Sequence, residues 1–381
     1  LHVTTTPSVS YVTVKDMFDC GIMITASHNR FCDNGIKIIN RYGEKLDDKT
    51  AALVESYIDG DLAPLGIEGD IPFATGEKIG CIVDYVAGRN RYIAYLISLA
   101  SHSYKSLRIG LDCANGASWS IASAVFGALG ARVSLIGAEP DGLNVNQNCG
   151  STHIENLCNF VKEKHLDMGF AFDGDADRML AVDENGKVVD GDQIMAIVGN
   201  FMKSQGRLKQ DKIIVTVMSN LGFSLMAKEN GIDIDQTKVG DRYVLEHMKE
   251  VGANLGGEQS GHIIFLDENT TGDGLLSALH LLEVMVSTKK KLSELAAIME
   301  VLPQALVNAK VPNHKKDSYM EYPEIAEAID TLTKKFDGEG RVLIRPSGTE
   351  PMVRVMIEGK DQKMIEEEAK KLAELITNTV L

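Results

Sequence analysis

The stretch LRIGLDCANGASWSIASAVFGALGARVSLI, residues 107–136, is the most informative part of the chain about its fold. It begins with an apolar run, passes through a loop of small residues into a segment with helical spacing, and ends in a second apolar run. This order predicts a strand, a helix and a strand, the repeating unit of α/β domains. Residues 211–239 repeat the order, with Gly231 placed to terminate the helix. We therefore predict two successive α/β modules, each with a largely parallel, covered sheet.

The segments on either side of these modules have different patterns. From about Leu306 onward, apolar runs and helical spacing follow the order strand, helix, strand, strand, helix, which predicts a separate, smaller α+β domain. Residues 46–60 and 78–100 have helical spacing, and the Gly- and Pro-bearing connector GDLAPLGIEGD (60–70) joins them. We expect the first domain boundary in this connector.

Composition limits the classes of function. The chain has 381 residues, enough for several domains, and a net charge of −15. This charge argues against nucleic acid or an anionic membrane as a partner, but a small anion can still bind where cations converge. The six cysteines lack the spacing of a disulfide framework or a zinc site. Because no apolar stretch is long enough to span a bilayer and no targeting segment is visible, we expect a cytoplasmic protein.

The stretch FAFDGDADRMLAVDENG, residues 170–186, predicts a metal site between two strands. Asp173, Asp175 and Asp177 repel one another unless a cation neutralises them, and oxygen ligands suit Mg²⁺ or Ca²⁺. An EF-hand loop is excluded because Arg178 occupies the sixth position, which requires glycine, and because the flanking segments resemble strands. A solvated acidic hairpin remains the alternative.

A second motif, RPSGTEPMVR (345–354), follows an apolar strand-like run. The backbone N–H groups and hydroxyls of its Ser-Gly-Thr segment can face one anion, and Arg345 and Arg354 add two guanidinium groups. The motif is therefore a candidate phosphate cradle. An ordinary turn stiffened by two prolines is an equally good interpretation of these residues alone.

A third motif, GGEQSGHIIF (256–265), gathers Glu258, Gln259, Ser260 and His262 among glycines before a strand. Short polar side chains of this kind can bind sugar hydroxyls, and Glu258 can also meet an amine. A surface turn explains the pattern equally well.

A fourth motif, ITASHNRFCDNGIKI (24–38), places Ser27 directly after an apolar strand. In α/β folds the carboxyl ends of strands are where ligands bind. The chain shows no Ser-His-Asp arrangement and no Gly-x-Ser-x-Gly elbow, so acyl transfer is not indicated. A phosphate ester on Ser27, held by the metal at the aspartate loop, would account for both motifs, whereas a local capping role for the hydroxyl is the alternative.

Together, the motifs TASHNRFCDNGIKI, DGDADR, GEQSGH and RPSGTEP, in this order, resemble the α-D-phosphohexomutase family over essentially the whole chain. The resemblance implies an α/β fold of four domains around a central cleft: three α/β domains with mixed sheets, the first truncated, and a smaller α+β carboxyl-terminal domain. The implied domains are residues 1–66, 78–180, 181–301 and 306–381. Because the family's amino-terminal strand and Arg-bearing loop have no counterpart before Leu1, we expect that this segment is missing.

The resemblance also implies a role for each motif. Ser27 would be the phosphoserine and, with Asp173, Asp175 and Asp177, would ligate Mg²⁺. Lys37, His28 and Arg178 would complete the catalytic centre. The implied substrate-binding residues are Gly240, Asp241, Glu258, Ser260 and His262 for the sugar, and Arg345, Ser347, Gly348, Thr349 and Arg354 for the phosphate that does not react. One position departs from the family pattern, because Arg30 stands where proline is usual.

Within the family, the stretches DGLNVNQNCGSTH (141–153) and VGDRYV (239–244), with Gln259, most resemble enzymes that interconvert glucosamine 6-phosphate and glucosamine 1-phosphate. The resemblance implies a phosphoserine mechanism with a 1,6-bisphosphate intermediate, serving UDP-N-acetylglucosamine synthesis. Glucosamine 1,6-bisphosphate or a similar bisphosphate would be the activator. The resemblance also implies a small sugar phosphate as the ligand and no nucleic acid or membrane partner. A homodimer is possible within the family. The alternatives are a phosphomannomutase or phosphoglucomutase, or a fragment that binds sugar phosphates with little turnover.

Overall fold

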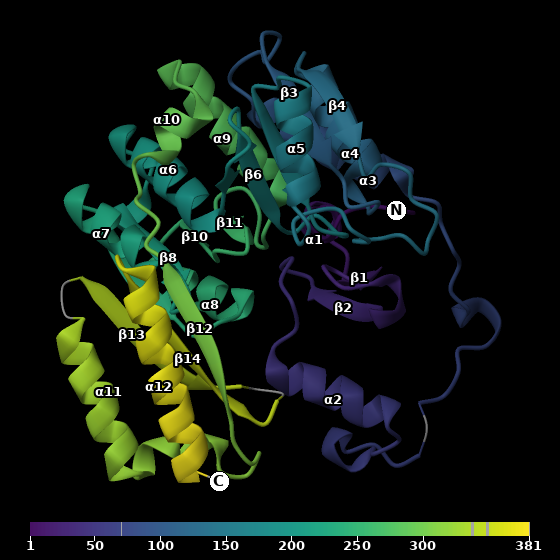
Figure 1. Ribbon diagram of the computed structural model, residues 1–381. Coiled ribbons are helices and arrows are strands. Elements are labelled where there is room, and N and C mark those ends of the chain that lie inside the picture. The colour runs from purple at the N-terminus through teal and green to yellow at the C-terminus, as the bar shows by residue number, and fades with distance from the viewer. Residues whose placement is uncertain (70, 337–338, 348–349, 381) are drawn as a thin grey trace. The chain divides into compact units, whose positions relative to one another are not determined.

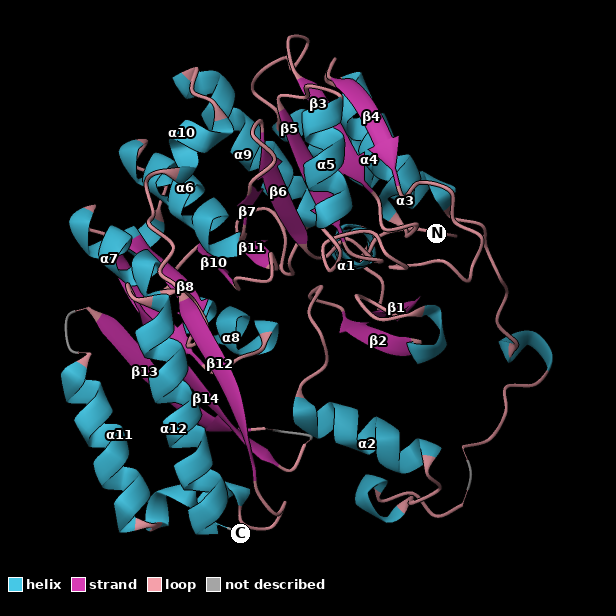
Figure 2. Cartoon of the chain, viewed as in Figure 1, coloured by secondary structure: helices cyan, strands magenta, loops and turns pink. Residues whose placement is uncertain are grey.

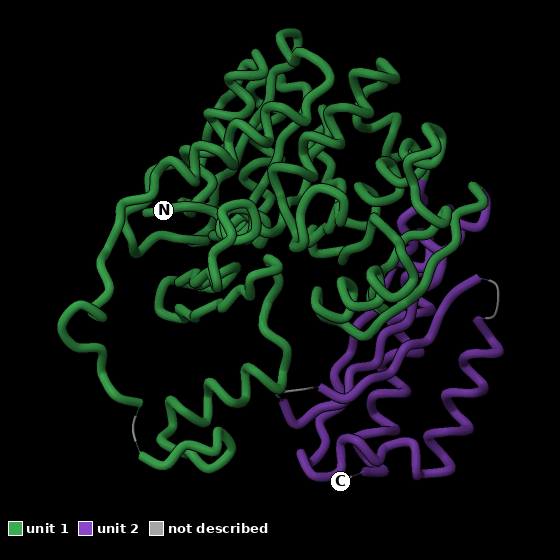
Figure 3. Tube along the Cα trace, turned by 180° about the vertical axis from the view of Figure 1, so that it is seen from behind, with its two compact units in different colours: residues 1–218, 230–298 green, residues 219–229, 299–381 purple. Residues whose placement is uncertain are grey.

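The computed structural model describes residues 1–69, 71–336, 339–347 and 350–380. The chain forms two compact units (Figure 3). The large unit comprises Leu1–Met218 and Asn230–Ile298, and the small unit comprises Ser219–Glu229 and Met299–Leu381. In the part of the chain that is described, no helix combines the length and apolarity that a membrane span requires.

The large unit begins with helix α1 (Thr6–Lys15), which is followed by strands β1 (Cys20–Thr25) and β2 (Gly35–Asn40) and by helix α2 (Asp48–Ile58). The two strands pair antiparallel, so that Met23 lies opposite Lys37. Helix α2 begins where the Asp47 carboxylate accepts a hydrogen bond from the N–H of Thr50 at 2.9 Å, a normal N-cap. The pairing of β1 with β2 places the connection that contains Ser27, residues 26–34 and here called the serine loop, at one end of this hairpin.

A five-stranded sheet is the largest of the sheets in the large unit (Figures 1 and 2). Its strands are β3 (Arg108–Asp112), β4 (Arg132–Ile136), β5 (Met168–Phe172), β6 (Met179–Asp183) and β7 (Val188–Val189), in the order β4-β3-β5-β6-β7. The helices of this part are α3 (Val86–Leu99), α4 (Ser118–Ala128) and α5 (Glu155–Glu163). The predicted strand–helix–strand unit is thus β3-α4-β4, and its strands are parallel. The pairs β5–β6 and β6–β7 are antiparallel, so the sheet is mixed and the prediction of a largely parallel sheet is wrong here.

The second sheet of the large unit has the order β11-β10-β8-β9. Its strands are β8 (Lys212–Thr216), β9 (Asp233–Thr237), β10 (Leu255–Gly257) and β11 (Ile263–Phe265), and its helices are α6 (Gly191–Ser204), α8 (Asp241–Val251), α9 (Gly274–Thr288) and α10 (Leu292–Ala296). Parallel pairing of β8 with β9 and β10 confirms the second predicted module, while β11 is antiparallel to β10. Val244 and Met248 on α8 pack against Ile214 and Ile264 of the sheet in one buried cluster.

Helix α3 begins at Val86, eight residues later than the helix expected over 78–100. Residues 79–84 are not helical, and Ile79, Ile82 and Val83 are exposed. Gly80 and these β-branched residues have low helix propensity, and no packing compensates for it. Within α3, Tyr92 is fully buried and its hydroxyl donates to Asp273 Oδ2 at 2.7 Å, which ties α3 to the N-terminus of α9.

The small unit contains α7 (Leu221–Glu229), β12 (Gln304–Lys310), α11 (Pro323–Lys335), β13 (Gly340–Pro346), β14 (Met352–Gly359) and α12 (Gln362–Val380). The antiparallel sheet has the order β12-β14-β13, which confirms the predicted strand–helix–strand–strand–helix order. Its core gathers Val353, Val355, Ile357, Ile365 and Ile376. Helix α7 belongs to this unit although its flanking strands belong to the large unit.

Glu358 on β14 explains why α7 belongs to the small unit. Its fully buried carboxylate accepts hydrogen bonds from Leu221 N–H at 3.2 Å and from Asn220 Nδ2 at 3.3 Å, and it forms an ion pair with Arg341 at 2.8 Å. Burial raises the pKa of Glu358 above its ordinary value, although Arg341 opposes the shift. One carboxylate therefore connects the start of α7 to two strands of the small sheet.

Replacing Glu358 with glutamine should lower the free energy of unfolding of the small unit by about 3 kcal/mol, because Arg341 would lose its buried anionic partner. Urea denaturation combined with hydrogen exchange of the small-unit amides would measure the change. As a matched control, Asp330→Asn removes an exposed ion pair with Lys334 and should cost less than about 1 kcal/mol. Equal effects of the two substitutions would contradict this account of Glu358.

Candidate functional site

The predicted metal loop, residues 173–178, connects β5 to β6 and buries three carboxylates. Asp173 and Asp175 are fully buried and Asp177 is 2% exposed, and their oxygens converge to within 4.8 Å of one another. Asp175 Oδ1 and Asp177 Oδ1 have no hydrogen-bond partner among the described residues. Burial, followed by the neighbouring Asp177 and Asp175 carboxylates, raises the pKa of Asp173 well above its ordinary value. Unpartnered buried oxygens that repel one another fit a hard cation, so the triad could hold a metal ion.

Lys37 on β2 reaches this loop from the first hairpin. Its Nζ lies 2.6 Å from Asp175 Oδ2 and 2.8 Å from Asp177 Oδ2. Burial alone would lower the pKa of Lys37, but the two carboxylates raise it above its ordinary value. Burial likewise acts to raise the pKa of Asp177, yet Lys37 and then His262 bring it below the ordinary value. A permanently charged ammonium group therefore stands beside the carboxylates.

The serine loop lies against the metal loop. Ser27 has a positive φ of 51°, a left-handed conformation that is unusual for a residue with a side chain. Its hydroxyl donates to Asp173 Oδ2 at 3.4 Å, and its carbonyl accepts a hydrogen bond from Gly174 N–H at 3.1 Å. The predicted phosphoserine and the predicted metal ligands are thus brought together across 146 positions of sequence. The backbone strain at Ser27 is of the kind found at functional positions.

Asn146 is a site residue to which the sequence analysis gave no role. It is 4% exposed, and its Nδ2 donates to the carbonyls of Ser27 at 2.8 Å and Asn29 at 2.7 Å. It therefore clamps both sides of the serine loop. In the sequence, the stretch DGLNVNQNCGSTH that contains Asn146 indicates only a resemblance to one branch of a family.

His28 and Arg178 flank the same centre. Arg178 lies 3.2 Å from His28 Nδ1, and its backbone N–H donates to Asp173 Oδ1 at 3.2 Å. Burial and then the Arg178 guanidinium lower the pKa of His28. Arg30, two residues after His28, has φ −73°, so the loop keeps the φ that a proline would impose.

The predicted sugar loop, residues 258–262, is the turn between β10 and β11. Glu258 Oε1 accepts a hydrogen bond from Gly240 N–H at 3.1 Å, and Ser260 Oγ donates to Glu258 Oε2 at 3.5 Å. Gly261 has φ +91°, and a Cβ there would lie 2.2 Å from the carbonyl oxygen of Met179, the residue that begins β6. Only glycine allows this approach, which places the sugar loop directly beside the metal loop. Gln259 donates its Nε2 to Asp190 Oδ2 at 3.1 Å.

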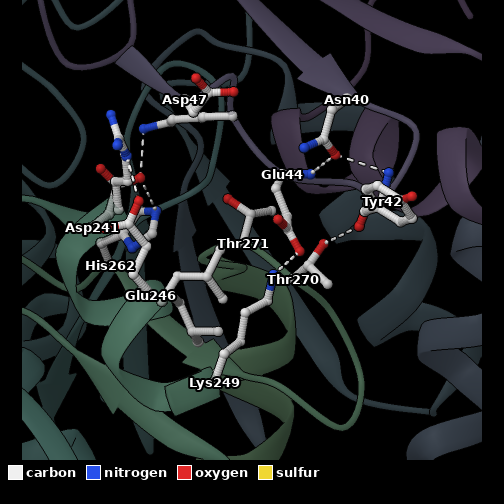
Figure 4. Close-up of a pocket in the computed structure, with 14 residues that line it drawn as sticks. Asn40, Tyr42, Glu44, Asp47, Asp241, Glu246, Lys249, His262, Thr270 and Thr271 are labelled. Carbon is white, nitrogen blue, oxygen red and sulfur yellow. Dashed lines mark hydrogen bonds and ion pairs between the residues drawn. The ribbon is translucent and has the colours of Figure 1, made fainter. Parts of the chain in front are cut away.

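A pocket of about 420 Å³ lies next to the sugar loop, between the segment after β2 and helix α8 (Figure 4). His262 is 2% exposed and its Nε2 lies 3.5 Å from Asp241 Oδ2, which also accepts a hydrogen bond from Lys45 Nζ at 2.5 Å. Burial acts to raise the pKa of Asp241, but His262 and Lys45 lower it below its ordinary value. Lys249 pairs with Glu44 across the same pocket (Figure 4). Two of the predicted sugar-binding residues, Asp241 and His262, therefore line one polar pocket, and Lys45 is an additional member.

The candidate phosphate loop belongs to the small unit. Arg345 on β13 lies directly opposite Arg354 on β14, and Arg354 also pairs with Glu350 at 3.1 Å. Burial and then Arg354 lower the pKa of Arg345. Two cations opposite each other on paired strands repel, so an anion between them would be stabilising. Ser347 is 3% exposed and its hydroxyl accepts from Glu350 N–H at 3.2 Å, whereas the predicted ligands Gly348 and Thr349 lie outside the described residues.

Four family models match the chain in order. They are the phosphoglucomutase/phosphomannomutase alpha/beta/alpha domains I (residues 1–63), II (90–186) and III (190–302) and the C-terminal domain (306–375). The chain is similar to the phosphoglucosamine mutase of Lachnospira eligens, with 54% identity over 94% of this chain and 78% of that protein. It is also similar to the phosphoglucosamine mutase of Acetivibrio thermocellus, with 53% identity over 99% of this chain and 82% of that protein.

Solved structures share the fold. A phosphoglucomutase/phosphomannomutase family protein from Burkholderia thailandensis has a TM-score of 0.76 and 22% identity, covering 99% of this chain and 82% of its own. An N-acetylphosphoglucosamine mutase from Aspergillus fumigatus, solved with GlcNAc-6P and magnesium, has a TM-score of 0.70 and 19% identity, covering 98% of this chain and 92% of its own. At these identities the likeness concerns the fold alone.

Proposed function

Because the chain belongs to the phosphoglucomutase/phosphomannomutase family, we propose that it interconverts glucosamine 6-phosphate and glucosamine 1-phosphate. It is an intramolecular phosphotransferase, and its product would serve UDP-N-acetylglucosamine synthesis. The observation that carries the proposal is the placement of the Ser27 hydroxyl 3.4 Å from Asp173, beside three buried carboxylates and the Lys37 ammonium. A phosphoserine at this position would meet both a cation site and a fixed positive charge.

The residues of the large unit divide the work of phosphoryl transfer. Ser27 would carry the phosphoryl group, and Asp173, Asp175 and Asp177 would hold Mg²⁺ together with a phosphate oxygen. Bound Mg²⁺ would supply positive charge to the transferring group. Lys37 would neutralise further charge, while His28 and Arg178 would line the same centre. Such transfers depend mainly on positioning and charge neutralisation, which this set of residues provides.

The reaction would proceed in two transfers. In the first, O1 of glucosamine 6-phosphate forms a bond to phosphorus, the bond to Ser27 Oγ breaks, and Oγ recovers the proton that O1 loses. In the second, the 1,6-bisphosphate presents its other end. Ser27 Oγ forms a bond to the phosphorus on O6, the bond from that phosphorus to O6 breaks, and O6 gains the proton that Oγ loses, leaving glucosamine 1-phosphate. Glucosamine 1,6-bisphosphate, or a similar bisphosphate, would phosphorylate Ser27 in resting protein.

Each unit contains candidate residues for substrate recognition. Gly240, Asp241, Glu258, Ser260 and His262 would contact the sugar, and the Glu258 carboxylate would meet its amine. In the small unit, Arg345, Ser347 and Arg354, with Gly348 and Thr349, would bind a phosphate group. We also propose that the four domains comprise residues 1–66, 78–180, 181–301 and 306–381, and that a homodimer is compatible with this function.

A coupled assay tests the proposal directly. With Mg²⁺ and glucosamine 1,6-bisphosphate present, the chain should convert glucosamine 6-phosphate at least about tenfold faster, as kcat/KM, than glucose or mannose phosphates, a difference of about 1.4 kcal/mol. Equal rates would instead support a phosphomannomutase or phosphoglucomutase of broader specificity. Binding of glucosamine 6-phosphate without turnover would contradict the catalytic assignment.

A further inference from the structure

Helix α1 begins beside the metal loop with an unusually polar buried turn. Thr4, Thr5, Thr6 and Ser8 are each at most 3% exposed. Thr5 is the N-cap of the helix, and its hydroxyl accepts a long hydrogen bond, 3.4 Å, from Ser8 N–H. Thr6 is not needed for this cap, because its hydroxyl is directed elsewhere.

Thr6 makes two hydrogen bonds to one metal-loop residue. Its Oγ1 donates to Asp175 Oδ2 at 2.5 Å, and its backbone N–H donates to the Asp175 carbonyl at 3.0 Å. The N–H is one of the donors that the first turn of a helix leaves without a helical partner. The side chain and main chain of Thr6 thus hold Asp175 at two points, from a helix 169 positions away in sequence.

The hydrogen bonds to Asp175 are unevenly distributed between its two oxygens. Oδ2 receives both the Thr6 hydroxyl and the Lys37 ammonium, whereas Oδ1 is buried with no hydrogen-bond partner among the described residues. Two donors on one oxygen fix the rotation of the carboxylate. They leave the other oxygen free as a ligand atom.

We propose that Thr6 is a positioning residue for the metal ligand Asp175, acting on the affinity of the site for a divalent cation. The inference rests on the metal site proposed above. Partners that orient metal ligands typically change metal affinity by about 10- to 100-fold when they are removed. Threonine suits the role because its β-branched side chain has few rotamers, so the hydroxyl is held in place before the cation arrives.

The test measures Mn²⁺ binding to the whole chain, by calorimetry and by the electron paramagnetic resonance signal of free Mn²⁺, with circular dichroism to verify folding. Thr6→Val keeps the shape but removes the hydroxyl, and it should weaken Mn²⁺ binding by about tenfold or more. Thr6→Ser keeps the hydroxyl and should stay within about threefold of the unsubstituted chain. The matched control is Thr13→Val, since Thr13 is a buried threonine of the same helix whose hydroxyl bonds to the Val9 carbonyl at 2.7 Å.

The outcomes separate this inference from the proposal on which it rests. The positioning role would be supported if Mn²⁺ binding were weakened in folded Thr6→Val but not in Thr6→Ser or Thr13→Val. Unchanged binding in that variant, or an equal loss in Thr13→Val, would overturn it while leaving the metal site intact. If the unsubstituted chain bound no Mn²⁺, the metal site itself would fail, and the role of Thr6 with it.

Discussion

Ser27→Ala should reduce turnover by at least about a thousandfold, because the chain would lose the oxygen that carries the phosphoryl group in both transfers. Intact-mass measurement should show a phosphate on the unsubstituted protein after incubation with the bisphosphate and none on the variant. Folding should be preserved, since Ser27 contributes its backbone to the loop: its N–H bonds to Thr25 Oγ1 at 2.8 Å and its carbonyl to Asn146. Alanine retains both contacts.

The control for this experiment is Ser204→Ala. Ser204 is an exposed serine at the end of α6. Its hydroxyl donates to the Phe201 carbonyl at 2.7 Å and accepts a long hydrogen bond, 3.5 Å, from Gln205 Nε2, so its removal should leave both turnover and mass shift unchanged. Binding of glucosamine 6-phosphate should also persist in Ser27→Ala, because the sugar loop does not depend on the hydroxyl. A phosphate that remained on the Ser27→Ala protein would place the phosphoryl carrier elsewhere.

The parts of the site that sequence alone could predict are those encoded locally. Asp173, Asp175 and Asp177 lie within five residues between two apolar runs, so their convergence follows from a single turn. The apolar run before Ser27 predicts a strand that ends just before it, and in the structure β1 ends at Thr25, two residues before Ser27. The opposition of Arg345 and Arg354 likewise follows from one short hairpin.

The parts that could not be predicted depend on long-range packing. Asn146 and Thr6 act on residues 119 and 169 positions away, and the polar residues beside each of them in sequence do not indicate which distant loop they contact. From its sequence, helix α7 is predicted to pack with the strands before and after it in the second module. In the structure it belongs to the small unit, where the buried Glu358 carboxylate bonds to its first residue. The helical spacing over 78–100 predicts a helix longer than α3, which begins at Val86. Spacing carries no information about whether packing will stabilise the first turns of a helix.

Asp175→Asn is expected to have the second largest effect on activity, after Ser27→Ala. The same variant also tests how Asp175 affects the stability of the metal-free chain. Asparagine has nearly the same shape but no charge, so the site would lose one of three carboxylates and bind Mg²⁺ on the order of a hundredfold more weakly. Activity should fall on the order of a hundredfold at millimolar Mg²⁺ and recover in part as Mg²⁺ is raised, whereas the Ser27 variant should not recover.

Without metal, the same substitution should change how the free energy of unfolding depends on pH. The raised pKa of Asp173 means that the folded chain binds more protons than the unfolded chain above pH 3.8, so metal-free stability falls as pH rises through that pKa. Asp175 is one cause of the shift, so Asp175→Asn should lower the pKa of Asp173 and reduce this loss. Urea denaturation in chelator from pH 4 to pH 8 would show a flatter pH dependence in the variant.

Asp183→Asn provides the matched control for both measurements. Asp183 is a buried aspartate, 2% exposed, at the end of β6, and its carboxylate accepts hydrogen bonds from Asn185 N–H at 2.8 Å and Lys187 N–H at 2.9 Å in the following turn. Its substitution should lower stability, because these hydrogen bonds are weakened, and should leave Mg²⁺ dependence unchanged, because Asp183 lies outside the converging triad. Normal Mg²⁺ dependence in Asp175→Asn would rule out the metal loop. A triad kept at a cost in metal-free stability has the property expected of residues retained for binding a cation, since the repulsion that destabilises the empty loop is what attracts the ion.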